Sequence, residues 1–235
     1  LTITGEDLGV ESVVVVSDPH TGYQFRLDVE YTESHRALRF EAPYWQGRDL
    51  ECSVEVGGQV PATSLSFSYR VPSFTVAVDS DESPTTGGTP IRLTGSGFGR
   101  QFFPQRDEFG DEQDSGVVLG TVTLGGRMLN CPEWSDALVV CVAPAGEGAR
   151  ETIVASAGLQ QSVFASDHVF AYDPPVLIPA LGDGPWITNT SGHTVVDANG
   201  TLARATFVLS GRNFGTRGAV MFGSFFEVAS DHPDV

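Results

Sequence analysis

Short apolar runs alternate with polar residues along most of the chain, and Gly, Pro, Asp and Ser interrupt these runs at intervals of roughly 8 to 12 residues. Alternation with a period of two places every second side chain on one face of a strand, where it can be buried. The period of about 3.6 residues that marks an amphipathic helix is nearly absent. The pattern therefore predicts an all-β protein built from β-sandwiches.

One strand-and-turn pattern occurs three times, at residues 1–9, 91–99 and 207–215. In each copy an alternating strand runs into a glycine, and a large apolar residue follows three positions later. We expect the first glycine to permit a backbone conformation that other residues avoid, and the apolar residue to fold back into the core. These apolar residues, called the plug residues below, are Leu8, Phe98 and Phe214.

There are two further echoes in the sequence, and the first of them marks where one module ends and the next begins. The segments ending in Tyr69 and Tyr172 are each followed by proline and a new apolar strand, and Ala-Pro43 is echoed by Ala-Pro144. The first module is expected to lack its opening strand, and the third to end early. The predicted tandem modules are residues 1–71, 72–174 and 175–235.

Spacing between the echoes locates two insertions. Leu8 and Phe98 are 90 positions apart, whereas Pro43 and Pro144 are 101 apart, so the middle module carries 11 extra residues. The third module likewise has extra residues before its glycine turn. The insertions are predicted near residues 100–116 and within residues 182–201.

The middle module carries a recognisable order of motifs. It has Gly87–Gly99, then Val122–Gly126, then Cys131 and Cys141, and finally Ala-Pro144. This order resembles the IPT/TIG family, immunoglobulin-like modules of cell-surface receptors, large extracellular repeat proteins, certain transcription factors and accessory domains of polysaccharide-acting enzymes. The first module departs from the pattern by lacking both cysteines, and the third by a long insertion in place of the Gly-Gly-Thr element. The resemblance implies an immunoglobulin-like fold and specifies no single function.

The charge of the chain argues against two classes of partner. Its 13 basic residues, all Arg, face 30 acidic residues, and the formal net charge is -17. Such a surface repels phosphate backbones and anionic lipid headgroups. The chain also has no apolar run of about 18 residues. We therefore expect no nucleic-acid partner and no direct membrane insertion in this segment.

The cysteines bear on the compartment. Cys131 and Cys141 flank a short segment as if on neighbouring strands of a hairpin, where Cβ atoms come close enough for a disulfide. In an oxidising compartment this bond would contribute about 2–3 kcal/mol of stability, and a pair of buried thiols is the alternative. Cys52 alternates with apolar residues on one strand face, which favours a buried core thiol over an intermolecular disulfide.

Two Asn-x-Ser/Thr sequons, at Asn189 and Asn199, fall within the insertion of the third module. Two sequons in one predicted surface loop favour N-glycosylation. Together with the expected disulfide, they indicate an extracellular or cell-surface location.

No catalytic constellation is visible in the sequence. The five His residues are dispersed in loop-like contexts, and no Ser or Cys stands in a nucleophile motif with an identifiable base. The acidic residues Asp79, Asp81 and Glu82 hint at a calcium loop, but Pro90 stands where an EF-hand needs its bidentate Glu. A solvated turn is the preferred interpretation, and weak calcium binding is the alternative. We expect no enzyme activity, no other metal and no cofactor.

Aromatic residues in loop-like contexts form the candidate interaction surface, which comprises Tyr44, Trp45, Phe102, Phe103 and Phe109. The alternative is that half or more of them are core residues. The three phenylalanines lie in the middle module's insertion, which adds aromatic surface that a sandwich does not require. We expect at least one of them to be buried against another module or another chain, and a neutral surface excursion is the alternative.

These features favour a structural or recognition role. The leading hypothesis is a tandem array in a secreted or cell-surface protein that forms a filament, sheath or adhesive coat. Its partners would be other protein chains, including copies of itself or neighbouring modules, with glycan contact as a further option. The alternatives are a ligand-binding segment of a receptor ectodomain and an accessory module of a polysaccharide-acting enzyme.

Overall fold

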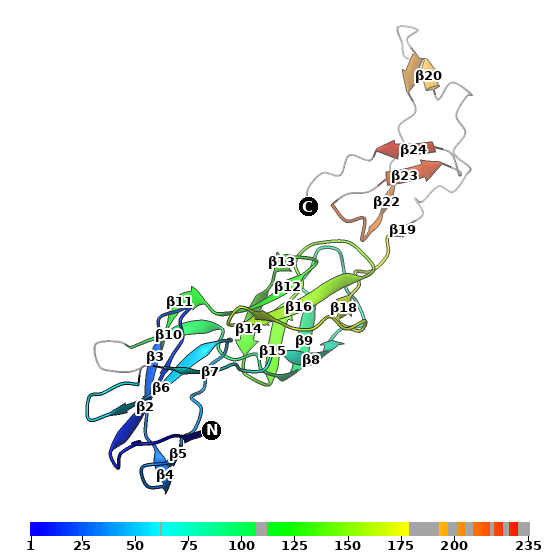
Figure 1. Ribbon diagram of the computed structural model, residues 1–235. Coiled ribbons are helices and arrows are strands. Elements are labelled where there is room, and N and C mark those ends of the chain that lie inside the picture. Colours follow the sequence, from blue (N-terminus) through cyan, green and yellow to red (C-terminus); the bar gives the residue numbers. More distant parts are fainter. Residues whose placement is uncertain are drawn as a thin grey trace. The chain divides into compact units, whose positions relative to one another are not determined.

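The computed structural model describes residues 1–61, 63–106, 112–178, 193–196, 202–204, 209–216, 219–222 and 226–229 (Figure 1). Regular secondary structure in these residues is β-strand, which confirms the predicted all-β class. Within these ranges, no helix has the length and apolar character needed to cross a membrane.

The chain divides into two compact units. The first unit contains two β-sandwiches and is made of Leu1–Asp81, Thr89–Ala143 and Arg150–Phe170. The second unit is made of Glu82–Gly88, Pro144–Ala149 and Ala171–Val235.

Seven strands form the first sandwich: β1 (Thr2–Thr4), β2 (Ser12–Ser17), β3 (Gln24–Leu27), β4 (Glu30–Glu33), β5 (Ala37–Arg39), β6 (Leu50–Val56) and β7 (Leu65–Phe67). One sheet has the order β3-β2-β6-β7, and the other has the order β1-β5-β4. The alternating valines of β2 bury Val14 and Val16 completely, and β6 contributes Leu50. Leu38 of β5 reaches the same core from the second sheet.

Nine strands form the second sandwich: β8 (Ser73–Val78), β9 (Pro90–Ser96), β12 (Gly120–Leu124), β13 (Arg127–Met128), β14 (Asn130–Trp134), β15 (Leu138–Val142), β16 (Glu151–Ala157), β17 (Gln160–Gln161) and β18 (Val169–Phe170). One sheet has the order β14-β15-β9-β8, and the other has β13-β12-β16-β17 with β18 also paired to β16 (Figure 1). Period-two alternation in β9 and β12 buries Ile91, Leu93, Val122 and Leu124 completely. This is the antiparallel two-sheet arrangement that the alternation predicted.

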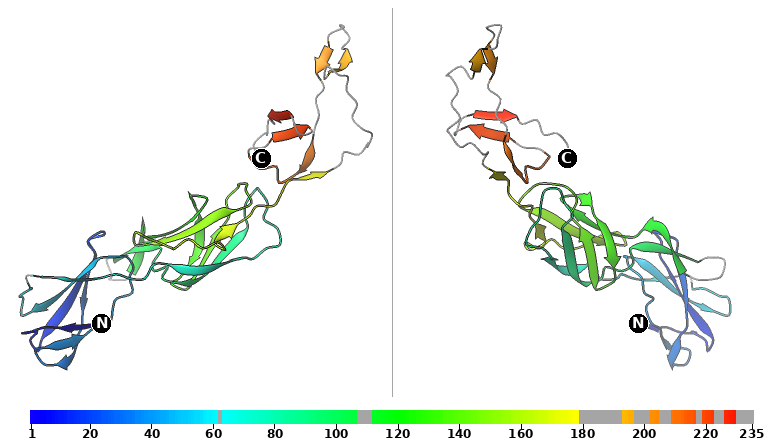
Figure 2. Two further views of the ribbon diagram at one scale, coloured as in Figure 1. Left: turned by 45° about the vertical axis from the view of Figure 1, so that its right-hand side comes forward. Right: turned by 180° about the vertical axis from the view of Figure 1, so that it is seen from behind.

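The predicted insertion of the middle module forms a hairpin. Its strands are β10 (Phe102–Arg106) and β11 (Glu112–Val118), which pair antiparallel with Phe102 opposite Val118. The turned views show this green hairpin beside the blue strands of the first sandwich (Figure 2). The hairpin therefore reaches from one sandwich of the first unit to the other.

In the residues of the second unit that the structure describes, three antiparallel strand pairs are present. They are β19 (Val176–Ile178) with β22 (Ser210–Arg212), β20 (His193–Val196) with β21 (Leu202–Arg204), and β23 (Ala219–Phe222) with β24 (Phe226–Ala229).

The three copies of the glycine turn share one backbone conformation. The residue before each plug residue has a positive φ: 57° at Asp7, 80° at Gly97 and 61° at Asn213. The residue after each plug residue also has a positive φ: 69° at Gly9, 61° at Gly99 and 73° at Gly215. Asp and Asn tolerate the left-handed region better than other side chains, so the turn keeps its shape where glycine is replaced.

The first glycine of the pattern has a different role from the one that we expected. None of Gly5, Gly95 and Gly211 has a positive φ. Instead, a Cβ atom at Gly95 would collide with the carbonyl oxygen of Ser73, and one at Gly211 with that of Val176. Glycine is needed at these two positions because the neighbouring strand passes too close for a side chain.

The plug residues fold back as expected but differ in depth. Phe98 is completely buried, whereas Leu8 and Phe214 are only partly buried. Leu8 packs against the first core, and the ring of Phe214 lies where a Cβ atom at Gly211 would be. Only the middle copy is therefore a fully buried plug.

The tyrosine of each junction echo, Tyr69 or Tyr172, forms hydrogen bonds with the segment that begins at the Ala-Pro echo, at Pro43 or Pro144. The Tyr69 hydroxyl donates to the carbonyl of Pro43 (2.6 Å), and the backbone N–H of Tyr69 donates to the carbonyl of Gly47 (2.9 Å). In the same way, the Tyr172 hydroxyl donates to the carbonyl of Pro144 (2.7 Å), and its backbone N–H donates to the carbonyl of Gly148 (2.8 Å). Burial raises the pKa of Tyr69 to about 12, so this hydroxyl stays a donor at physiological pH.

Replacing Phe98 by Ala should lower the free energy of unfolding of the second sandwich by about 3–5 kcal/mol, because a completely buried ring leaves a cavity. The matched control is Phe164→Ala, which removes a ring that is 65% exposed and should cost less than about 0.5 kcal/mol. Urea unfolding of the full chain measures both. Similar losses for the two variants would contradict the buried position of Phe98.

Candidate functional site

The strongest candidate site is the contact between the two sandwiches of the first unit. One side of it is the loop of residues 44–47, whose two ends are held by the Tyr69 hydrogen bonds. Within this loop Trp45 and Gln46 are only 4% and 3% exposed, whereas Tyr44 is 52% exposed. The loop therefore turns two of its side chains inward, although it lies outside the strands.

An aromatic cluster forms the apolar part of the contact. Phe103, from β10 in the hairpin, meets Trp45 with ring centroids 5.9 Å apart and Tyr23 at 5.3 Å, both edge to face. Tyr23 in turn stacks on Trp45 at 4.9 Å, and Phe25 meets both rings edgewise. Leu119 also packs against the first core. Such geometry adds attraction beyond apolar burial, so the hairpin closes one side of the first core.

Polar contacts join the same loop to the glycine turn of the second sandwich. The Tyr44 hydroxyl donates to the carbonyl of Gly99 (3.0 Å), and the side-chain oxygen of Gln46 accepts the backbone N–H of Arg100. The Arg100 guanidinium lies over the Tyr44 ring, 5.3 Å from its centroid. Burial raises the pKa of Tyr44, and Asp136 adds to the rise while Arg100 opposes it. The Tyr44 hydroxyl therefore remains a neutral donor.

The second sandwich fixes the turn from its own side. The Trp134 indole donates to the carbonyl of Gly99 (3.1 Å), and the backbone N–H of Gly99 donates to Asp136 (3.0 Å). A Cβ atom at Gly99 would collide with the side chain of Gln46. The turn thus presents a rigid backbone surface that only glycine leaves open to the loop.

The second unit contains the same contact between a loop and a glycine turn. A carboxylate oxygen of Glu147 accepts the backbone N–H of Thr216 (2.9 Å), and a Cβ atom at Gly215 would collide with that side chain. Glu147 is three positions after Pro144, as Gln46 is three after Pro43. Thr216 follows the last glycine of its turn, as Arg100 does. The contact therefore occurs twice, with Gln in one copy and Glu in the other.

Sequence reasoning missed Gln46 and Glu147. Both are polar residues in loops, and neither belongs to the glycine pattern or to the aromatic clusters. A signal was nevertheless present, because these two residues are 101 positions apart, the spacing that separates Pro43 from Pro144. Comparing the loops after the two prolines would have found them.

A buried carboxylate, that of Asp18, holds Trp45 in place through a hydrogen bond. Asp18 is 5% exposed and accepts a hydrogen bond from the Trp45 indole (2.9 Å) and one from the backbone N–H of His20 (2.9 Å). Burial alone would raise the pKa of Asp18, but the hydrogen bonds from Trp45, His20 and Thr21 outweigh it and lower the pKa. The folded state therefore favours the ionised carboxylate.

The structure separates the residues of the predicted interaction surface. Trp45 and Phe103 meet in the aromatic cluster, Tyr44 is partly exposed beside the turn, and Phe102 is half-buried. Phe109 lies outside the described residues, as do the sequons at Asn189 and Asn199. A surface for other chains at these aromatics stays a prediction, and so does glycosylation.

Cys131 and Cys141 form the expected disulfide, with sulfur atoms 2.07 Å apart. Cys52 is a free, buried thiol, and burial raises its pKa. In the proposed calcium loop, Asp79 pairs with Arg92 at 2.9 Å. In the part of the chain that the structure describes, no three acidic, His or Cys side chains are placed to hold a metal ion. The calcium alternative thus gains no support from Asp79, Asp81 and Glu82.

The chain was compared with models of known protein families and with curated proteins. A family model described as the IPT/TIG domain matches residues 74–172, from β8 to Tyr172. No curated protein matches the chain.

The lowered pKa of Asp18 predicts acid sensitivity of the first sandwich. A carboxyl group whose folded pKa is depressed contributes stability above its unfolded pKa, and this contribution is lost as pH falls through the folded value. We expect the free energy of unfolding to drop below about pH 4 in the wild type. Asp18→Asn should be less stable at neutral pH and less sensitive to acid, whereas exposed Asp28→Asn should follow the wild type. Urea unfolding across pH measures this, and equal pH profiles for Asp18→Asn and wild type would contradict it.

Proposed function

We propose that this chain, whose residues 74–172 are an IPT/TIG domain and hence an immunoglobulin-like interaction module, is a structural segment of a secreted or cell-surface repeat protein. It consists of three modules, at residues 1–71, 72–174 and 175–235. They bind neighbouring modules and other protein chains, including copies of this one, and contribute to an extracellular filament, sheath or adhesive coat.

The observation that carries this proposal is the repeated contact between a loop and a glycine turn. In both units a Gln or Glu oxygen accepts the N–H of the residue after the turn's last glycine. The partner of the side chain is a backbone group, so the contact requires the shape of the turn and no particular side chain at the bonded position. Any module with this turn offers the same surface, which suits a protein built by stacking similar units.

The disulfide supports an extracellular setting, and the charge and the aromatic contacts support a protein partner. A structural disulfide persists in oxidising compartments and is rare in the reducing cytosol, which fits the Cys131–Cys141 bond. The net charge of -17 disfavours nucleic acid as a partner. The rings of Tyr23, Trp45 and Phe103 contact one another, which supports a role in holding neighbouring modules together.

The docking role is tested by Phe103→Ala in the full chain, with Phe102→Ala as the matched control on the same strand. Loss of the Phe103 ring should lower the stability of the first sandwich by about 2 kcal/mol or more and split its unfolding from that of the second sandwich. Phe102 is absent from the aromatic cluster, so its loss should leave a single transition. Scanning calorimetry reports both. Independent unfolding of the two sandwiches already in the wild type would argue against docking.

Assembly with other copies is tested by sedimentation velocity over about a hundredfold concentration range, which is wide enough to reveal weak association. We expect the weight-average sedimentation coefficient to rise with concentration. Mutation of exposed Tyr44 to Ser should weaken this rise if the predicted aromatic surface meets other chains. A coefficient independent of concentration would contradict self-association by this segment.

A further inference from the structure

Strand β8 lies at one edge of its sheet, with β9 as its one partner among the described strands (Figure 1). It pairs with β9 without interruption over all six residues, Ser73–Val78. Two backbone hydrogen bonds show which of its groups face β9. Asp79, which directly follows β8, donates its N–H to the carbonyl of Pro90 on β9 (3.3 Å). Gly95 of β9 donates its N–H to the carbonyl of Ala137, on the side away from β8 (2.9 Å).

The backbone groups of β8 alternate in direction along the strand. Since the N–H of Asp79 faces β9, the N–H and C=O groups of Phe74, Val76 and Val78 point away from β9. The carbonyl of Phe74 accepts a hydrogen bond from Nε2 of His168 (2.8 Å), and the two rings stack. Within the described residues, no hydrogen bond reaches the outward backbone groups of Val76 and Val78. These groups are called the β8 edge below.

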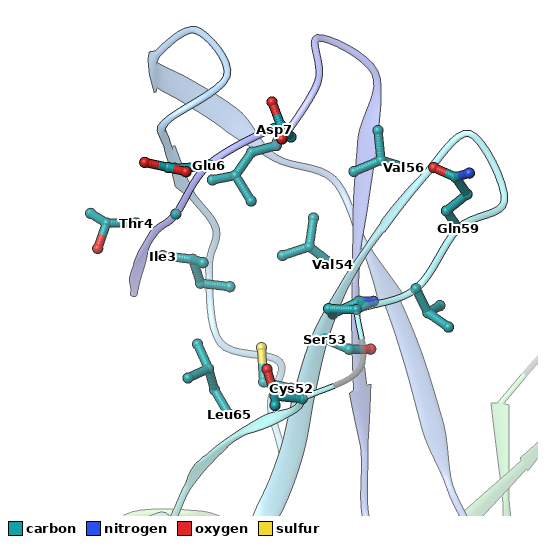
Figure 3. Close-up of a pocket in the computed structure, with 15 residues that line it drawn as sticks. Ile3, Thr4, Glu6, Asp7, Cys52, Ser53, Val54, Val56, Gln59 and Leu65 are labelled. Atoms are coloured by element: carbon teal, nitrogen blue, oxygen red, sulfur yellow. The ribbon is translucent and has the colours of Figure 1, made fainter.

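The β8 edge lacks the features that protect other sheet edges of this chain. Edge strand β14 has Pro132, Glu133 and a register shift, and edge strand β3 has Arg26. Edge strand β7 is only three residues long, with Leu65 opposite Cys52 of β6 (Figure 3). By contrast, β8 is the longest edge strand in the described sheets of the two sandwiches, and within it there is no charge, no proline and no register shift. A long, uncharged edge is a surface to which another strand can add.

The second unit has a proline where β8 has an outward N–H. Its strand β19 corresponds to β8, because Leu177 and Phe74 both stand opposite the first glycine of the turn pattern. Two positions after Leu177 the sequence has Pro179, whereas two positions after Phe74 it has Val76. Proline has no N–H and cannot donate to an incoming strand. The second sandwich thus keeps an edge donor that the corresponding sequence of the second unit lacks.

We infer that the β8 edge binds the β8 edge of a second copy of this chain, in an antiparallel pair. Val76 of each copy stands opposite Val78 of the other, and the two strands exchange four backbone hydrogen bonds. Ala77 stands opposite Ala77 of the second copy, on the twofold axis. This register leaves the bond between His168 and Phe74 intact. The inference rests on the proposed function, and it names the surface through which copies associate.

Charge favours a second copy in the antiparallel direction. The net charge of -17 makes copies repel over most of their surface, so a contact between them needs an uncharged segment such as residues 71–78. Arg70, before this segment, and Asp81, after it, are both exposed, while Asp79 is paired with Arg92. Antiparallel pairing brings Arg70 of one copy toward Asp81 of the other and keeps the two Asp81 carboxylates apart. Parallel pairing would bring like charges together.

The test is sedimentation velocity of the full chain at concentrations up to about 1 mM, because so short a strand pair associates weakly. Ala77 is exposed, and Ala77→Glu places two carboxylates opposite each other at the axis, so it should weaken self-association at least about tenfold. Ala77→Arg should weaken it for the same reason. An equimolar mixture of the two variants should associate, since Glu then faces Arg. Thr94→Glu is the matched control: it adds the same charge to an exposed position on β9, away from the edge, and should associate as the wild type does.

A proline at Val76 tests the backbone pairing itself. Val76→Pro removes an N–H that points away from β9, so the sheet keeps its own hydrogen bonds, and self-association should weaken at least about tenfold. Val76→Thr keeps the N–H and the side-chain shape and should associate as the wild type does. Scanning calorimetry checks that each variant folds.

Equal association of Ala77→Glu and the wild type would overturn the inference, and it would leave self-association through another surface intact. A mixture of the two Ala77 variants that fails to associate would also overturn it. A wild-type sedimentation coefficient that is independent of concentration would contradict the proposed self-association as well, so the two failures can be told apart.

Discussion

At Gly99 the side chain of Gln46 occupies the space that a Cβ atom would need, and the same is true of Glu147 at Gly215. Both contacts require glycine, which has no side chain, directly after the plug residue. The residues on either side of the plug residue have a left-handed backbone conformation. At Gly95 the absent Cβ makes room for a neighbouring strand instead. Close approach permitted by glycine thus determines how sheets pair and how loops meet turns.

The first sandwich depends on its neighbour for part of its core. Phe103 lies on the hairpin and Leu119 directly follows it, and both pack against the cluster that contains Trp45 and Leu38. The loop-closure entropy of an insertion grows only slowly with its length, and a partly buried aromatic ring more than offsets that cost. Asp18, which bonds the Trp45 indole, fixes the surface on which Phe103 rests. The hairpin therefore contributes to the first core, although in the sequence it lies between the strands β9 and β12 of the second sandwich.

Features encoded over short stretches could be read from the sequence. Alternation predicted the strands, the threefold glycine pattern predicted the turns, and two cysteines on a hairpin predicted their bond. The role of Gly95 could not be predicted, because the colliding carbonyl of Ser73 comes from another strand. Gln46 escaped for the same reason, since its partner is a backbone group 54 positions away that has no side-chain signature. Long-range contacts to the backbone leave few traces in residue types.

Cys52 has a consequence for how the first sandwich can be followed in solution. It is the one cysteine outside the disulfide, its side chain faces the first core, and burial raises its pKa. Thiol reagents attack the thiolate, so they modify this residue only in molecules whose sandwich has opened. The rate of Cys52 modification therefore measures the rate or extent of opening of the first sandwich, and no label needs to be introduced into the chain.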